Sequence, residues 1–164
     1  MYNTIKSFTE DWERESGFTI KIFEALSDES LNQKVTPNGR ALGRLGWHLV
    51  ETIGEMLSHA GVKAFVSEEE NKFSAAALVD EYKKAAKSVA PALSANWKDE
   101  ELNDKVNMYG EEWAKRDVLV SLVKHEIHHR AQMTVLMRQA GLKVPGIYGP
   151  SFEEWQSYGM TPQV

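Results

Sequence analysis

The feature that most constrains this chain is a pair of histidines inside a long amphipathic segment near its C-terminal end. The segment runs from Val118 to Ala140, and it contains His125 and His129 four residues apart. On an α-helix, residues with this spacing lie on one face, one turn apart. A helix uses the same spacing to offer two imidazoles to one metal ion. The segment is therefore predicted to be a helix that supplies two metal ligands.

The direction of each side chain separates the pair from the neighbouring His128. At about 100° per residue, His129 projects about 40° from His125, and both lie inside the main apolar arc of the helix. His128 projects about 60° the other way, at the edge of that arc. We therefore expect His125 and His129 to be the ligand pair and His128 to be a neighbour.

A third ligand is expected from an earlier helix, predicted over residues 39–60 and ended by Gly61. His48 lies on the apolar side of this helix. A lone histidine there is usually a core residue bonded to a backbone carbonyl, but the inward pair on the last helix favours a ligand. His59 lies about 16 Å further along the helix axis, so one ion cannot use both. His59 is expected to face the helix dipole at the C-terminal end.

The remaining segments predict an all-α fold. Helices are expected over residues 2–27, 39–60, 74–93 and 115–140, with Pro91 closing the third. Residues 97–112 form a polar connection too irregular for a helix, with a possible short extended piece at 106–110. We predict a single domain over residues 1–164, an up-down-down-up four-helix bundle with a long connection between the third and fourth helices.

Composition excludes several classes of protein. The chain has no cysteine, so disulfides, thiolate ligands and a cysteine nucleophile are ruled out, and any metal site must use His, Asp, Glu and water. A net charge of −5 without a basic stripe argues against nucleic acid. No run approaches the roughly 20 apolar residues of a membrane span, and the first residues lack the apolar core of a signal peptide. We expect a cytoplasmic protein without a membrane or nucleic-acid partner.

Three neutral imidazoles would leave coordination open on a zinc- or nickel-like ion. Such an ion lowers the pKa of a bound water toward ~7, which yields a hydroxide nucleophile, and it can equally activate an incoming thiol as thiolate. The main alternative is that the histidines are ordinary core residues and bind no metal.

Rival metal chemistries share part of the motif. Residues 125–129 formally match His-Glu-x-x-His, in which Glu126 would be the general base of a metalloprotease. The metzincin extension fails, because Gln132 and Val135 stand where it needs glycine and histidine. A di-iron bundle needs a second Glu-x-x-His, which is lacking. We keep Glu126 as a possible acid or base, and Glu15 and Glu55 as candidates to hydrogen-bond the ligands.

Three segments together resemble the DinB-like (YfiT-type) family of metal-binding four-helix bundles, which is distinct from the DNA polymerase of the same name. They are residues 47–49 (Trp-His-Leu), residues 125–132 (His-Glu-Ile-His-His-Arg-Ala-Gln) and the tail at 139–150. Ala131 stands where family members commonly have glycine. The resemblance covers essentially the whole chain.

The resemblance implies one divalent metal ion per chain, usually zinc or nickel, bound by His48, His125 and His129. Characterised relatives include thiol-dependent transferases and isomerases that use bacillithiol or mycothiol, and others are labelled metal-dependent hydrolases. We therefore expect a metal-dependent S-transferase acting on small electrophiles with a low-molecular-weight thiol as co-substrate, in stress or detoxification. The alternatives are a hydrolase using metal-bound hydroxide and a non-enzymatic metal- or ligand-binding module.

A homodimer is also expected. The family implies it, and a second apolar stripe on the last helix, together with an aromatic tail, exceeds what one core needs. The stripe consists of Val120, Val123, Ile127 and Thr134.

Overall fold

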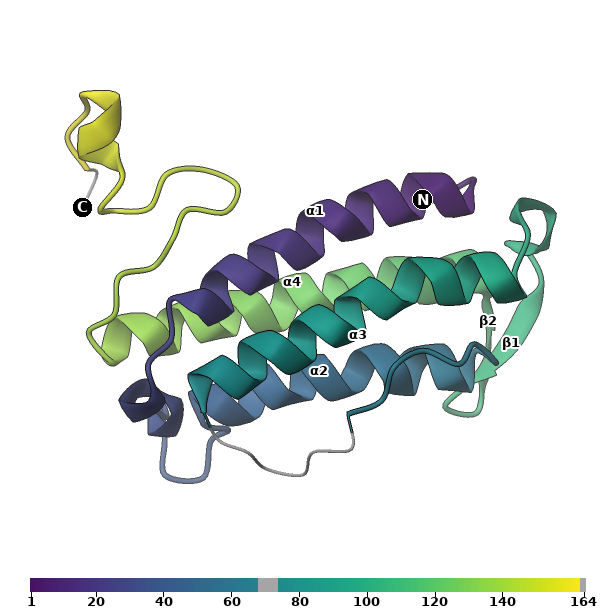
Figure 1. Cartoon of the computed structure of the whole chain (residues 1–164), viewed down its shortest axis with the longest axis horizontal. Coiled ribbons are helices and arrows are strands. Elements are labelled where there is room, and N and C mark those ends of the chain that lie inside the picture. Colours follow the sequence, from purple (N-terminus) through teal and green to yellow (C-terminus); the bar gives the residue numbers. More distant parts are fainter. Residues whose placement is uncertain (68–73, 163–164) are drawn as a thin grey trace.

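Four helices make up most of the molecule (Figure 1). The structure is a computed structural model that describes residues 1–67 and 74–162. They are α1 (Ile5–Glu24), α2 (Leu42–His59), α3 (Ala75–Asn96) and α4 (Lys115–Gln139). The short 3-10 helices are η1 (Asp28–Asn32), η2 (Asp99–Glu101) and η3 (Trp155–Tyr158), and the strands are β1 (Lys105–Met108) and β2 (Glu111–Ala114). Within the described ranges, no helix has the length and apolarity needed to cross a membrane.

The helices form a bundle in which α1 and α4 run one way and α2 and α3 run the other way (Figure 1). Helix α1 packs against α3 and α4, and α2 packs against the same two helices. The predicted all-α, up-down-down-up four-helix bundle is confirmed. Because α2 and α4 are antiparallel neighbours, the middle of one faces the middle of the other.

The core is built from the apolar stripes expected from the sequence. Each helix contributes buried residues at helical spacing, which is the pattern of one face turned inward. They include Phe8, Trp12, Ile22 and Phe23 of α1, Leu45, Leu49, Ile53 and Met56 of α2, Leu78, Tyr82, Ala85 and Val89 of α3, and Val118, Leu122, Met133 and Leu136 of α4.

The prediction that Pro91 ends the third helix is wrong, because α3 continues to Asn96. A proline inside a helix removes one hydrogen bond and costs about 3 kcal/mol or more. Here Pro91 lies on the exposed side, where water can reach the carbonyl that it leaves free. Beyond it, Leu93 and Trp97 are buried in the core. Their burial offsets the cost and keeps the last turn helical.

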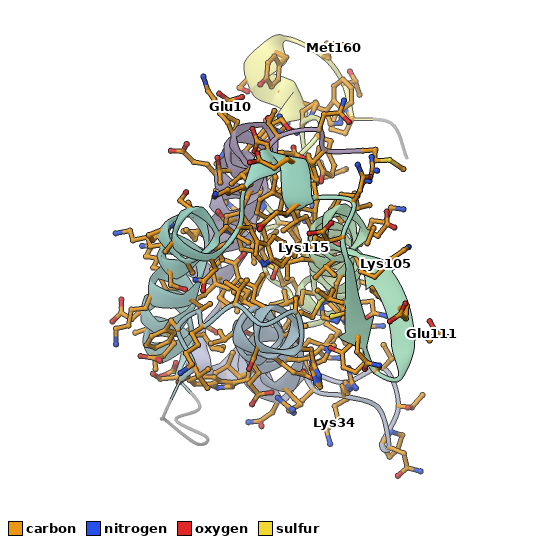
Figure 2. The ribbon with its side chains drawn as sticks, turned by 90° about the vertical axis from the view of Figure 1, so that its right-hand side faces the viewer. Glu10, Lys34, Lys105, Glu111, Lys115 and Met160 are labelled. Atoms are coloured by element: carbon orange, nitrogen blue, oxygen red, sulfur yellow. The ribbon has the colours of Figure 1, made fainter. Side chains whose placement is uncertain are left out.

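The connection between α3 and α4 contains a β-hairpin, where the sequence indicated only a short extended piece. Strand β1 pairs antiparallel with β2, from Lys105 opposite Ala114 to Met108 opposite Glu111. Tyr109 and Gly110, both with positive φ, form the turn, as two-residue hairpins require. Figure 2 looks onto this end of the bundle, where β1 contacts α2 and β2 contacts α4. Met108 is buried, so the hairpin closes this end of the core.

An ion pair between α1 and α4 is buried inside the bundle. Arg130 donates to the Glu15 carboxylate at 2.6 Å and to the Glu15 backbone carbonyl at 2.8 Å. Tyr148 from the tail donates to the same carboxylate at 2.5 Å, and its ring packs edge-on against Phe18. The tail therefore folds back onto α1 (Figure 1). Glu15 pairs with Arg130 and Tyr148 rather than with a histidine, so the expectation that it hydrogen-bonds a ligand is wrong.

Replacing Arg130 with methionine should lower the free energy of unfolding by about 3–5 kcal/mol, because the buried Glu15 carboxylate then keeps only the exposed Arg14, 3.7 Å away, as a cation. Urea denaturation followed by circular dichroism measures this. Arg138→Met is the matched control, since Arg138 pairs with Glu153 at the surface and should cost at most about 1 kcal/mol. Adding Glu15→Leu to Arg130→Met should recover much of the loss. Equal effects of the two arginine variants would contradict this role of the ion pair.

Candidate metal centre

Three imidazoles meet between α2 and α4. One ring nitrogen each of His48, His125 and His129 lies within 4.8 Å of the other two. The Nε2 atoms of His48 and His125 are 3.1 Å apart. Nitrogens that share a tetrahedral zinc ion lie about 3.3 Å apart, given metal–nitrogen bonds of about 2.0–2.1 Å. The structure thus brings together the three histidines singled out in the sequence, in an arrangement compatible with one metal ion.

Burial keeps these imidazoles neutral. It lowers the pKa of His48 and of His125 to about 4, and mutual repulsion with the protonated form of His129 acts in the same direction. Burial also lowers the pKa of His129, although its hydrogen bond to Gln132 opposes the shift. Only a neutral imidazole has a ring lone pair to give to a metal. At neutral pH the cluster is therefore in its ligating form.

Gln132 orients one of the three rings. Its side-chain oxygen lies 2.8 Å from Nδ1 of His129. An amide oxygen only accepts hydrogen bonds, so Nδ1 carries the proton and the lone pair stays on Nε2. The amide nitrogen of Gln132 lies 3.0 Å from Nε2 of the exposed His128. Gln132 follows His129 by three residues and His128 by four, so the helical spacing of such neighbours was the signal available in the sequence.

The other two rings differ in their polar neighbours. Nδ1 of His48 lies 3.4 Å from the hydroxyl of Thr52, which itself donates to the His48 carbonyl at 2.5 Å. Nδ1 of His125 is buried and has no hydrogen-bond partner in the described part of the chain. His128 lies outside the group of three, in line with its expected place as a neighbour.

Glu126 faces the interior of the bundle, away from α2. Its carboxylate is fully buried and accepts hydrogen bonds from Thr19 of α1 at 3.0 Å and from Tyr82 of α3 at 2.8 Å. Burial raises the pKa of Glu126 to about 7, against the opposing effect of these two donors. One residue along a helix turns the side chain by about 100°, which separates Glu126 from His125. These contacts do not fit the general base of a metalloprotease.

Two other polar residues that the sequence singled out, Glu55 and His59, lie at the hairpin end of the bundle. Glu55 is exposed, and its carboxylate lies 3.5 Å from the Tyr109 hydroxyl. The prediction that Glu55 hydrogen-bonds a ligand is therefore wrong. His59 is in the last turn of α2, as expected, and its ring packs against Tyr109 with 4.6 Å between centroids.

A cavity of about 500 Å³ adjoins the imidazole cluster on the side away from the hairpin. One wall comes from the loop before α2 and the other from α4. Its lining includes Val35 and Arg40 of the loop, Leu45 of α2, and His129, Gln132 and Leu136 of α4. The cluster therefore borders a largely apolar space large enough for a small molecule.

Known proteins resemble this chain over nearly its full length. The chain is 40% identical over 162 residues to "Uncharacterized protein YrdA" of Bacillus subtilis (strain 168), covering 98% of this chain and 97% of that one. A crystal structure of a DinB-like protein from Bacillus cereus ATCC 10987 is 39% identical, with a TM-score of 0.84 over 90% of this chain and all of that one.

A DinB-like protein from Bacillus subtilis, YjoA, shares the fold at 17% identity, with a TM-score of 0.68 over 86% of this chain and 97% of the other. The sequence model of the DinB family matches residues 1–163. With this match and the 40% identity to YrdA, the chain belongs to the DinB family.

Proposed function

We propose that His48, His125 and His129 bind one divalent metal ion, zinc or nickel, and that the protein is a metal-dependent S-transferase. In this reaction a low-molecular-weight thiol attacks a small electrophile. The observation that carries the proposal is the convergence of three neutral imidazoles, with one ring nitrogen of each within 4.8 Å of the other two, beside a largely apolar cavity that His129 lines. Three protein ligands leave coordination open, which distinguishes a catalytic site from a closed structural one.

The donor set fits such an ion. The 3.1 Å between the Nε2 atoms of His48 and His125 is close to the separation of ligands on one metal. Imidazole nitrogen suits zinc and nickel alike. When bound, the ion would act as a Lewis acid and lower the pKa of a thiol at its open position.

Other residues of the chain orient a ligand ring and set the polarity around the proposed metal site. Gln132 holds the His129 ring in the tautomer that presents Nε2, and the His128 imidazole accepts from the Gln132 amide nitrogen. Leu45 and Leu136 give the cavity an apolar wall beside His129, and low-dielectric surroundings strengthen electrostatic interactions.

Two observations favour transfer of a thiol over hydrolysis. The chain has no cysteine, so a sulfur nucleophile must come from a co-substrate, and the cavity offers it space. Hydrolysis of the metalloprotease type would need a carboxylate base within hydrogen-bond reach of the water. Glu126 was the candidate, and its carboxylate lies buried in the core, where Oε2 accepts from Thr19 and Tyr82.

Metal binding is tested on protein purified without an affinity tag. Elemental analysis should find about one zinc or nickel ion per chain, and His129→Ala should abolish it because two imidazoles are too few. Gln132→Leu should weaken metal affinity by about 10–100-fold, because His129 loses its orienting partner.

Two histidine variants serve as controls for metal binding. His59→Ala removes an imidazole at the hairpin end and should leave the metal content unchanged. His128→Ala should have a much smaller effect than His129→Ala, since it leaves the bond from His129 to Gln132 in place. Full retention of metal by His129→Ala would show that the ligand set is wrong.

The reaction is tested with metal-loaded protein, an aryl chloride as model electrophile and a panel of low-molecular-weight thiols. The sulfur–carbon bond should form as chloride leaves and the thiol proton passes to solvent, with a rate that depends on both metal and thiol. His129→Ala should reduce this rate to the uncatalysed level.

The same experiment separates the alternatives when carboxylic and phosphate esters are added to the panel. Ester turnover without thiol would favour a hydrolase. Absence of turnover across the panel, with metal still bound, would favour a non-enzymatic binding module.

A homodimer stays a prediction. Of the proposed stripe, Val123 is buried within the single chain and Ile127 packs against its core, so less of this surface is left for a partner. Phe152, Tyr158 and Met160 in the tail are exposed. Light scattering at micromolar concentration should give twice the chain mass of 18.5 kDa. A mass of one chain would contradict the dimer.

A further inference from the structure

The cavity beside the imidazole cluster has a distinct distribution of polarity. The residues that form its walls are mainly aliphatic. Two of these residues, Val35 and Val135, are more than half exposed. Exposed apolar side chains gathered at one opening are typical of a binding site. His129 and Gln132 form the inner polar part.

Among the described residues that line this cavity, Arg40 is the one with a fixed charge, and none of them is acidic. Neither an ion pair nor a hydrogen bond of its guanidinium is formed within the described ranges. Arginine normally presents five donors to carboxylates or phosphates. Nearby Arg44 differs, because it is already paired with Glu51 at 2.8 Å.

The backbone at Arg40 is held in place. The preceding residues form a tight turn in which the Gly39 amide donates to the Thr36 carbonyl at 3.0 Å. A Cβ at Gly39 would lie 3.1 Å from the Thr36 hydroxyl, so the turn leaves little space for a side chain. The Leu42 amide closes the loop on the Gln33 carbonyl at 2.9 Å. The backbone position of Arg40 relative to α2 is therefore set by the fold, and its exposed side chain lines the cavity.

We propose that this cavity binds a small molecule with an apolar body and one anionic group, with the anion on Arg40 and the other end at the imidazole cluster. The proposal rests on the proposed function, because it describes the thiol co-substrate or the electrophile of that site. A cation in a cleft with low-dielectric walls attracts anions and disfavours cations. The aliphatic walls contribute by burying the body of the ligand.

Two probes that differ only in charge test this. Isothermal titration of zinc-loaded protein is made with 6-mercaptohexanoate and with 6-mercaptohexanol. The acid should bind about tenfold more tightly, as expected for one charge-assisted hydrogen bond. The affinity of Arg40→Met for the acid should fall to its affinity for the alcohol, and the affinity for the alcohol should not change. Arg40→Lys should keep part of the preference.

Arg44→Met is the matched control and should keep the full preference for the acid, since Arg44 already pairs with Glu51. Equal binding of the two probes to the wild type, or a preference that survives in Arg40→Met, would overturn the proposal. The latter result would mean that the carboxylate binds elsewhere, for instance on the metal. Failure of the proposed function is distinguishable, because it appears as absence of zinc binding or as absence of thiol-dependent turnover, and neither of these measurements compares the two probes. Hexanoate and hexanol then test Arg40 on the metal-free protein.

Discussion

Glu15 carries a carboxylate into the interior of the bundle, and the fold accommodates it because Arg130 lies opposite. Burying an unpaired charge costs several kcal/mol, so the two residues must meet for α1 and α4 to pack. Tyr148 donates to the same carboxylate and thereby joins the tail to the two helices. Arg130 directly follows His129. The rotation of α4 that satisfies the ion pair is therefore the rotation that turns its imidazoles toward α2.

Helix α4 carries two polar pairs that differ in position by one residue. His125 and His129 meet His48 of α2, and His129 also lines the cavity. Arg130 faces α1, and Glu126 contacts α1 and α3. A step of one residue turns a helical side chain by about 100°, which is enough to place the pairs in different compartments. The first compartment adjoins the cavity, and the second is a buried network that includes Thr19 and Tyr82. One helix thus combines a candidate site with the interactions that hold it in register.

Much of the fold was predictable, because it depends on periodicity. The apolar stripes of all four helices, Gly61 after the second helix and the inward pair His125 and His129 are local patterns that a helix converts directly into a face. The failures have a different origin. Pro91 was expected to end a helix that the burial of Leu93 and Trp97 extends, so tertiary packing overrode the local preference.

By itself the sequence determined the helical segments, their inward faces and the pair of candidate ligands on the last helix, since each depends on spacing within one segment. His48 was added as the third candidate because it lies on the inward face of another helix. Only the tertiary structure decided which polar groups meet. It paired Glu15 with Arg130, turned Glu126 into the core and left Glu55 exposed at the hairpin end. It also set Arg40 beside His129 at one cavity. These contacts join residues far apart in the chain, and they depend on the relative rotation of packed helices, which no local pattern specifies.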